Sequence, residues 1–184
     1  MGYTVFLDRD GVINRDSSAY VKTPSEFVFI EKSPEAVALL TRHGFDVIVI
    51  TNQSVIGRGM TAPDELDRIF AKMTHGISAA GGNIKDIFYC PHTPDDGCIC
   101  RKPLPGLIHK ARDTYGIDPD RSCMVGDSAK DIECAKNAGC GASVLVRTGN
   151  GERAEKTLEQ KSIHPDFIAG NLYEAACWII KNLP

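Results

Sequence analysis

The chain has 184 residues, 42% of them hydrophobic and 24% charged, and its formal net charge at pH 7 is −3. This composition is typical of one globular domain, expected here to span residues 1–184, and it excludes a broad basic surface for nucleic acid or an anionic membrane. No apolar run reaches the roughly 20 residues of a membrane span, and residues 1–7 lack the basic flank of a signal peptide. We therefore expect a cytoplasmic protein, and we expect a monomer because no large apolar stripe calls for a partner.

The predicted elements alternate between buried strands and helices. The first half of the chain predicts a strand at Tyr3–Leu7, a helix at Glu35–His43 behind an N-cap at Ser33, a strand at Asp46–Thr51, a helix from Pro63 to about Ala80 behind an N-cap at Thr61, and a strand at Ile84–Tyr89. The second half predicts a helix at Pro105–Tyr115, a strand at Cys123–Val125, a helix at Ala129–Ala138, strands at Ser143–Val146 and Phe167-Ile168, and a helix at Asn171–Lys181. Residues 149–151 are expected to form a plain turn and residues 152–162 a polar connector.

This alternation predicts an α/β, Rossmann-like fold of three layers, in which a parallel sheet carries helices on both faces. The loop from Arg15 to Phe29 is too short for a separate cap domain, so no large cap is expected. Parallel sheets of this kind bind ligands beyond the carboxyl ends of their strands, where the strand order reverses. The residues that follow each strand are therefore the first candidates for chemistry.

The first strand is followed by Asp8-Arg9-Asp10-Gly11. Two carboxylates one residue apart repel each other and need a cation or a proton. Mg²⁺ suits them because this hard cation prefers carboxylate oxygens, and Gly11 allows the backbone to turn away sharply. Taken alone, the pair is equally well explained as a loop with two solvated acids.

Polar residues also follow the later strands. Thr51-Asn52-Gln53-Ser54 after the second strand can hold phosphate oxygens, and Arg101-Lys102 can offset phosphate charge. Asp127 ends the fourth strand, and Asp131 lies four residues further on the same side of the next helix. Each feature alone has an ordinary explanation as turn chemistry, a surface cation pair or acids at a helix start. Their order at successive strand ends predicts one site for a metal ion and an anion.

Four metal-ligating residues fall within 11 positions of the chain: Cys90, His92, Cys98 and Cys100. Three thiolates and one imidazole form the closed tetrahedral ligand set of a structural Zn²⁺. We therefore expect a zinc-binding loop at residues 90–100, without an open position for catalysis, that fixes Arg101 and Lys102 at the rim of the site. The other cysteines lie among apolar neighbours and are expected to be buried thiols: Cys123, Cys134, Cys140 and Cys177.

Together these motifs resemble those of the haloacid dehalogenase superfamily of phosphohydrolases, and the resemblance covers nearly the whole chain. It implies a Mg²⁺-dependent phosphatase in which Asp8 is the nucleophile that forms an aspartyl-phosphate and Asp10 is the general acid and base. Thr51 and Lys102 would hold the phosphoryl oxygens. The resemblance also implies that Mg²⁺ is bound by Asp8, the backbone carbonyl of Asp10, and Asp127, while Asp131 supports the site without binding the metal directly.

Within the superfamily, the zinc loop is similar to those of two groups of small-metabolite phosphatases. One group removes the 7-phosphate of D-glycero-D-manno-heptose 1,7-bisphosphate in nucleotide-activated heptose biosynthesis, and the other acts on histidinol phosphate. The segments around Tyr20-Val21, Thr51–Ser54 and Cys100–Pro103 favour the heptose group, which implies these substrate contacts: Asp16, Tyr20, Thr51, Asn52, Gln53, Ser54, Arg58, Arg101 and Lys102.

Two observations bear on the choice between these groups. The five-residue gap between His92 and Cys98 is similar to the spacing of the histidinol group, and Ser128 replaces a basic residue found in some members. A bisphosphate has a second anionic group, for which Arg58 and Arg101 are available. The amine of histidinol would instead require an acid such as Asp16 or Glu26.

Two other classes of protein fit the sequence less well. A nucleic-acid end phosphatase would need a basic track or an aromatic platform, and the net charge of −3 and the lone Trp178 speak against both. A non-enzymatic module with a zinc knuckle would leave the ordered acids and Lys102 without a purpose.

Overall fold

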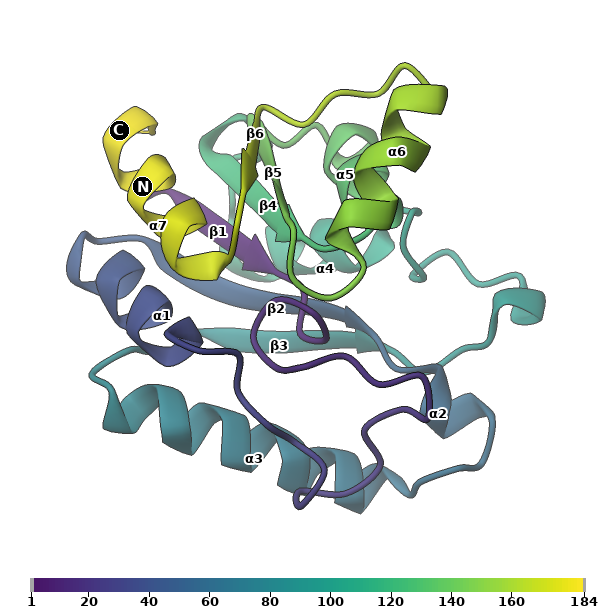
Figure 1. Cartoon of the computed structure of the whole chain (residues 1–184). Helices are drawn as coiled ribbons and strands as arrows, with labels where there is room; N and C mark the ends of the chain where they lie inside the picture. Colours follow the sequence, from purple (N-terminus) through teal and green to yellow (C-terminus); the bar gives the residue numbers. More distant parts are fainter. Residues whose placement is uncertain (1, 184) are drawn as a thin grey trace.

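The computed structural model describes residues 2–183, so the two end residues of the predicted domain lie outside the described part. At its centre is a six-stranded parallel sheet in the order β3-β2-β1-β4-β5-β6 (Figure 1). Its strands are β1 (Thr4–Leu7), β2 (Asp46–Asn52), β3 (Asp86–Cys90), β4 (Ser122–Gly126), β5 (Ala142–Val146) and β6 (Phe167–Ala169). The strand order reverses between β1 and β4, so the carboxyl ends of these two strands mark the switch point.

Helices cover both faces of this sheet, which confirms the predicted three layers (Figure 1). One face is packed against α1 (Ser33–Arg42), α3 (Pro63–Ala79) and α7 (Leu172–Asn182), and the other against α4 (Gly106–Tyr115), α5 (Ala129–Ala138) and α6 (Gly151–Gln160). A short helix, α2 (Ser54–Gly57), and two 3-10 turns at residues 94–96 and 119–121 complete the described elements. Among residues 2–183, no helix has the length and apolar character needed to cross a membrane.

The central strand β1 shows how the sequence builds the two layers. Successive side chains of a strand point to opposite faces. Val5 and Leu7 therefore pack into the cluster that contains α1, α3 and α7, whereas Phe6 packs into the cluster beneath α4 and α5. All three side chains are fully buried. The burial of β1 on both faces fixes the position of the residues that follow it.

The segment between β1 and α1 folds over the carboxyl edge of the sheet and rests on α3. The Nζ of Lys72 donates hydrogen bonds to the carbonyl oxygens of Pro24 and Phe27, at 2.6 and 2.9 Å. Gly76 of α3 gives room for the ring of Phe29, because a Cβ at this position would lie 2.5 Å from that ring. This segment is a short cover over the edge of the sheet and not a cap domain, as expected from its length.

The structure corrects one predicted element. Residues 152–162, predicted to form a polar connector, lie mostly within helix α6. Ala154 and Leu158 of α6 are buried and pack with Ile132 of α5 and Leu145 of β5. Ala154 and Leu158, four residues apart, form a narrow apolar stripe, while the rest of α6 is mostly charged or polar. The composition of the segment hid the helical spacing.

The two predicted N-caps are also wrong. Ser33 lies inside α1, and its hydroxyl donates to the carbonyl oxygen of Ile13 at 2.6 Å. The hydroxyl of Thr61 donates to the carbonyl oxygen of Lys22 at 2.7 Å, and α3 begins after Ala62. Both hydroxyls therefore anchor the segment that follows β1, where they satisfy carbonyl oxygens of its backbone.

The seven cysteines are all free thiols. Of the four expected to be buried, Cys123 and Cys134 are buried, as predicted, whereas Cys140 is half-buried and Cys177 is exposed. The prediction for Cys177 is wrong because α7 turns this position outward while Ala176 and Ile179 face the sheet.

Candidate active site

Asp8 lies directly after β1, at the switch point of the sheet. Its backbone N–H donates to the carbonyl oxygen of Val125 in β4 at 3.0 Å, which fixes the residue between the two strands. The side chain is 13% exposed, and its Oδ1 lies 2.9 Å from the Nζ of Lys102. The same Oδ1 accepts a hydrogen bond from the backbone N–H of Arg9 at 2.8 Å. Both contacts are to Oδ1, so Oδ2 is left for an electrophile or a cation.

Asp10 is positioned by three side chains that donate to its carboxylate. The buried guanidinium of Arg9 lies 2.7 Å from Oδ1, and the Nδ2 of Asn14 donates to the same oxygen at 2.9 Å. The Nε2 of Gln53 donates to Oδ2 at 2.9 Å and also to the hydroxyl of Thr51 at 2.9 Å. Donors on both oxygens hold the Asp10 carboxylate in one orientation beside Asp8 and Thr51.

Lys102 is buried and carries the positive charge at the centre of the site. Its Nζ lies 2.6 Å from Oδ1 of Asp131 and 2.9 Å from Oδ1 of Asp8, and it donates to the carbonyl oxygen of Ile50 at 2.9 Å. Burial alone would lower the pKa of this amine, but the carboxylates of Asp131 and Asp8 raise it above its ordinary value. The lysine is therefore a permanent cation beside Asp8.

The backbone of Lys102 is joined to the end of β2. Its N–H donates to Oδ1 of Asn52 at 3.1 Å, and Nδ2 of Asn52 donates back to the carbonyl oxygen of Lys102 at 3.2 Å. Arg101 is fixed differently, because its Nη1 donates to the carbonyl oxygen of His92 at 3.0 Å. The two adjacent cations thus depend on different parts of the fold.

Asp127 follows β4 and is only 3% exposed. Its Oδ2 accepts hydrogen bonds from the backbone N–H of Asn150 at 2.8 Å and from the Nδ2 of Asn150 at 3.3 Å. The same Nδ2 donates to Asp16 at 2.8 Å, so Asn150 bridges the two acids. Gly11 and Gly149 lie so close to Asp127 that a Cβ at either position would overlap its carboxylate. The turn at residues 149–151, predicted to be plain, is therefore part of the site.

The electrostatics of the acids fit a divalent cation. Oxygens of Asp8, Asp127 and Asp131 all lie within 4.8 Å of one another. Burial raises the pKa of Asp8 to about 6, against the opposing effect of Lys102. Burial, with the charges of Asp131 and Asp8, raises the pKa of Asp127 to about 8. Without another cation, the cluster holds more negative charge than Lys102 offsets, and its hard oxygen donors suit Mg²⁺.

Asp131 has little capacity left for a metal. One oxygen is ion-paired with Lys102, and the other accepts hydrogen bonds from the backbone N–H and the hydroxyl of Ser128, at 3.0 and 2.6 Å. The side chain is fully buried. Its contacts agree with a supporting position behind Lys102.

The four predicted zinc ligands come together in the loop after β3. The thiols of Cys90 and Cys100 lie 3.1 Å apart, and each lies 3.6 Å from the thiol of Cys98. The Nδ1 of His92 is 3.3 Å from Cys100 and 3.6 Å from Cys90. Zn–S bonds of about 2.3 Å place tetrahedral ligands roughly 3.8 Å apart, so this cluster can close around one Zn²⁺.

The thiol of Cys98 has a lower pKa than those of Cys90 and Cys100. Burial raises the pKa of Cys98, but hydrogen bonds from the thiol of Cys100 and the N–H of Arg101 outweigh this effect. The net result is a pKa of about 7, below the ordinary value of a thiol. A thiolate is the form that binds metal. The loop is also anchored to α2, where the N–H of Gly57 donates to the carbonyl oxygen of Pro91 at 2.9 Å.

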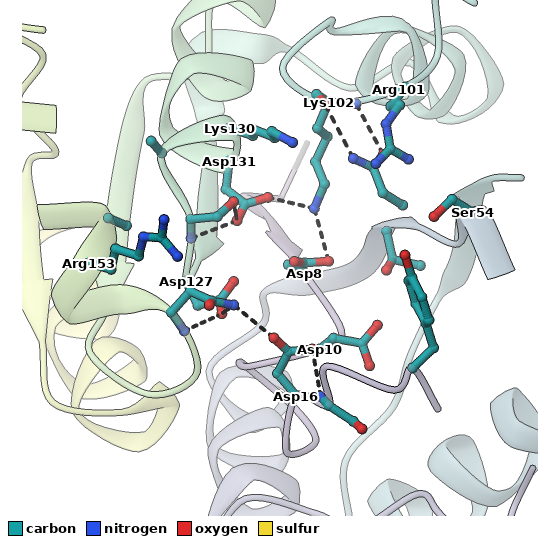
Figure 2. Close-up of a pocket in the computed structure, with 18 of the residues that line it drawn as sticks. Asp8, Asp10, Asp16, Ser54, Arg101, Lys102, Asp127, Lys130, Asp131 and Arg153 are labelled. Carbon is teal, nitrogen blue, oxygen red and sulfur yellow. Dashed lines mark hydrogen bonds and ion pairs between the residues drawn. The ribbon is translucent and has the colours of Figure 1, made fainter. Parts of the chain in front are cut away.

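One pocket of about 660 Å³ brings most of the predicted residues together (Figure 2). Of the residues predicted from the sequence, its lining contains Asp8, Asp10, Asp16, Tyr20, Thr51, Asn52, Ser54, Arg58, Arg101, Lys102, Asp127 and Asp131. Gln53 does not line the pocket and reaches the site only through Asp10 and Thr51. The lining also contains residues that the sequence did not suggest, among them Lys130, Asn150, Arg153 and Thr157.

The missed residues lie on two helices. Lys130 lies between the two predicted acids Asp127 and Asp131, where a single lysine has no sequence signal that separates it from an ordinary surface lysine. Arg153 and Thr157 lie in the segment that was not predicted to be helical. A three- or four-residue spacing of apolar positions through Ala154 and Leu158 was the one signal that could have placed them.

Comparison with known proteins gives a consistent result. A model of HAD-hydrolase-like proteins matches residues 99–175. The D-glycero-beta-D-manno-heptose-1,7-bisphosphate 7-phosphatase of Bordetella bronchiseptica is 46% identical over 156 residues, which is 85% of either chain. The enzyme of the same name from Pseudomonas aeruginosa is 46% identical over 166 residues, or 90% of this chain and 93% of that protein.

Solved structures agree with the sequences. The crystal structure of D,D-heptose 1,7-bisphosphate phosphatase from B. bronchiseptica, complexed with magnesium and phosphate, matches with a TM-score of 0.91 at 39% identity. The match covers 97% of this chain and 98% of that one.

Proposed function

This chain belongs to the D-glycero-D-manno-heptose-1,7-bisphosphate 7-phosphatase family of haloacid dehalogenase-like hydrolases, and we propose that it removes the 7-phosphate from that bisphosphate. The reaction is the hydrolysis of a phosphomonoester, and its place is the synthesis of nucleotide-activated heptose. The observation that carries the proposal is the arrangement around Asp8. The carboxylate of Asp8, at the switch point, lines the pocket, and the buried ammonium group of Lys102 lies 2.9 Å from it. The carboxylate of Asp127 lies within 4.8 Å of Asp8.

In the first step, an oxygen of Asp8 attacks phosphorus, the P–O7 bond breaks, and an aspartyl-phosphate forms. Asp10, when protonated, gives its proton to the departing sugar oxygen. Lys102 and the hydroxyl of Thr51 hold oxygens of the phosphoryl group while charge shifts among them.

In the second step, water attacks the phosphorus of the aspartyl-phosphate, and the P–O bond to Asp8 breaks. Asp10 accepts a proton from that water. The donors from Arg9, Asn14 and Gln53 orient the carboxylate of Asp10 for this transfer, and Gln53 also aligns the hydroxyl of Thr51. Phosphate leaves, and Asp8 is restored.

The residues that would hold Mg²⁺ are Asp8, the backbone carbonyl of Asp10, and Asp127. When bound, the ion supplies positive charge that offsets the repulsion between an anionic nucleophile and an anionic phosphate. Asn150 donates to Oδ2 of Asp127, so Oδ1 would be the oxygen available to the metal. Zn²⁺ would be bound by the four ligands of the loop at residues 90–100, with no position open for substrate.

The sugar would lie between two walls of the pocket. One wall comes from the loop after β1, the end of β2, the region of α2 and the residue after the zinc loop. It presents Tyr20, Asn52, Ser54, Arg58 and Arg101. The guanidinium of Arg58 lies over the ring of Tyr20, with its carbon 6.0 Å from the ring centroid. Asp16 is at the edge, where Asn150 already donates to it. These contacts suit a hydroxylated, anionic substrate more than a cationic amine.

The proposal extends to location, oligomeric state and nucleic-acid binding. A reducing, cytoplasmic environment suits seven free thiols and a thiolate zinc site. A monomer is proposed because the sequence has no large apolar stripe that calls for a partner. The negative net charge offers no track for a nucleic acid.

The test compares phosphate release from heptose 1,7-bisphosphate and from histidinol phosphate, with Mg²⁺ present. We expect the bisphosphate to be turned over with the higher kcat/KM, and Asp8→Asn to abolish both activities while Asp113→Asn, an exposed acid away from the pocket, keeps them. A higher kcat/KM for histidinol phosphate would identify that compound, and not the bisphosphate, as the substrate. Activity in Asp8→Asn would overturn the mechanism.

A further inference from the structure

The zinc loop, residues 90–100, is held to the rest of the fold mainly near its ends. At its start, the carbonyl oxygen of Pro91 accepts the backbone N–H of Gly57 at 2.9 Å. Apart from the contacts of the Cys98 thiol, residues 94–99 make no hydrogen bond to any other helix or strand within residues 2–183. The middle of the loop is therefore closed onto its base by the four metal ligands.

One of these ligands, Cys98, is open to small molecules. Cys90 is buried, whereas Cys98 is half-buried and lines a second cavity of about 320 Å³. This cavity shares Arg101 and Lys102 with the lining of the active-site pocket, so it lies next to that pocket. Its volume is ample for a molecule little larger than water, such as hydrogen peroxide. The proposed reaction gives this cavity no role.

Two other thiols lie close enough to Cys98 to react with it. Its Sγ is 3.6 Å from the Sγ of Cys90 and 3.6 Å from that of Cys100. A disulfide needs about 2.0 Å between its sulfur atoms, and the sparse anchoring of residues 94–99 leaves room for that shift. Two sulfurs joined to each other no longer bind Zn²⁺ as thiolates. The bound metal and a disulfide are therefore alternative states of the same ligand set.

We propose that the zinc loop is a redox switch, in which hydrogen peroxide oxidises Cys98 and Zn²⁺ is released. The thiolate of Cys98 attacks one oxygen of the peroxide, the O–O bond breaks, and the departing hydroxide takes a proton to form water, which leaves a sulfenic acid. The thiolate of Cys90 or Cys100 then attacks this sulfur, and the hydroxyl group leaves with a second proton as water. Two thiolates thus give two electrons to the peroxide, and the metal loses two of its four ligands.

The effect on the enzyme follows from the anchoring of Arg101. Its Nη1 donates to the carbonyl oxygen of His92, inside the loop, whereas Lys102 is held by β2. Loss of zinc should free Arg101 and leave Lys102 beside Asp8. This kinetic effect rests on the proposed function, because it assumes that Arg101 contacts the substrate, but the release of zinc does not.

The experiment treats the zinc-loaded enzyme with hydrogen peroxide. Released Zn²⁺ is measured with a chromogenic chelator, free thiols with a thiol reagent, and the disulfide by peptide mass spectrometry. Cys177→Ser is the control and the background for thiol counting, because it removes an exposed thiol outside the zinc loop. Cys98→His removes the proposed target but keeps a zinc ligand at this position, and its zinc content is measured first.

We expect each zinc ion released to be matched by the loss of about two thiols, with Cys98 in the disulfide. Release should be about tenfold slower from Cys98→His and should proceed from Cys177→Ser as from the wild type. KM for the bisphosphate should rise about tenfold with a smaller change in kcat, and a thiol reductant with Zn²⁺ should reverse both.

Three results would overturn the switch: zinc that stays bound while Cys177 is oxidised, a disulfide that lacks Cys98, or release that is as fast from Cys98→His. A fall in kcat at constant KM would overturn the role given to Arg101. The zinc and thiol measurements use no substrate, so they judge the switch whichever phosphate ester the enzyme hydrolyses.

Discussion

At the scale of single residues, Asn150 connects the metal site to the edge of the pocket. It contacts Asp127 twice and Asp16 once, through its backbone N–H and its side-chain amide. Groups of this kind orient a metal ligand and determine which of its oxygens remains free. In the proposed mechanism Asn150 would therefore act through Asp127, as a positioning residue.

Replacing Asn150 with alanine should weaken Mg²⁺ binding by about tenfold, the lower end of the range for such groups, because the backbone N–H to Asp127 remains. Calorimetric titration of the metal-free protein with Mg²⁺ measures this directly. Asn182→Ala, at the exposed end of α7, is the control and should bind Mg²⁺ like the wild type. An unchanged affinity in Asn150→Ala would show that Asp127 needs no such support.

The buried acids also predict how the metal-free protein responds to pH. The pKa values of Asp8 and Asp127 are raised in the folded state to about 6 and about 8, from an ordinary value of 3.8. Between pH 4 and 8 the folded state thus binds more protons than the unfolded chain, so stability falls as pH rises through this window. Mg²⁺ removes this cost by pairing with the carboxylates.

In thermal unfolding with a chelator present, the melting temperature should be lower at pH 8 than at pH 5.5, by about 5 °C or more. Adding Mg²⁺ should raise the melting temperature more at pH 8 than at pH 5.5. Asp8→Asn should reduce the pH dependence, because one of the two titrating groups is gone. A chelated protein that becomes more stable toward pH 8 would contradict this account.

At the scale of elements, the two adjacent cations are anchored by different parts of the fold, one by the zinc loop and the other by β2. Arg101 is bound to the carbonyl of His92, inside the loop, whereas Lys102 is joined to Asn52 and Ile50 of β2. The sequence predicted that the loop positions both cations. The contacts show a more direct hold on Arg101.

Cys98→Ser should therefore lose zinc and affect binding more than turnover. We expect KM to rise about tenfold as Arg101 becomes mobile, with kcat changed less, because Lys102 keeps its anchors on β2. Metal analysis of the purified protein and steady-state kinetics provide the two measurements. Cys177→Ser, which removes an exposed thiol outside the cluster, should change neither; a collapse of kcat at constant KM would place Lys102 under the control of the loop instead.

The elements also show where sequence reasoning succeeds and where it stops. Strands buried on both faces, such as β1, appear as continuous apolar runs, so their ends and the polar residues after them can be located without a structure. Helix α6 has only Ala154 and Leu158 as a buried stripe, and its charged composition resembles a linker. Because α6 was missed, Arg153 was missed, and Asn150 looked like an ordinary turn residue. Contacts between loops far apart in the chain leave no periodic signal.

At the scale of the whole molecule, the strand order determines which residues can meet. The reversal between β1 and β4 places Asp8 and Asp127 side by side, although 119 positions separate them in the chain. The core beneath them is built on both faces of β1, and Phe6 is the large side chain on the face covered by α4 and α5. The precision of the site therefore depends on this packing.

Phe6→Ala should lower the free energy of unfolding by about 3–5 kcal/mol, because it removes a fully buried ring and leaves a cavity. Urea unfolding at equilibrium, followed by circular dichroism, measures the change. Tyr173→Ala, an aromatic residue that is 37% exposed on α7, should cost much less. Comparable losses for the two variants would mean that the centre of the sheet is not where the stability resides.

The separate anchoring of Arg101 and Lys102 has a consequence for how such enzymes can diverge. Insertions or exchanges within residues 91–99 should displace the arginine and leave the lysine joined to β2, so we expect the loop to tolerate changes in length without disturbing the groups assigned to phosphate transfer. Natural variation should therefore accumulate in this loop first, and a graft of it from a relative should transfer substrate preference while preserving the reaction. Substrate preference could then vary up to Arg101, whereas phosphate transfer would be kept from Lys102 onward, so one peptide bond separates the two roles.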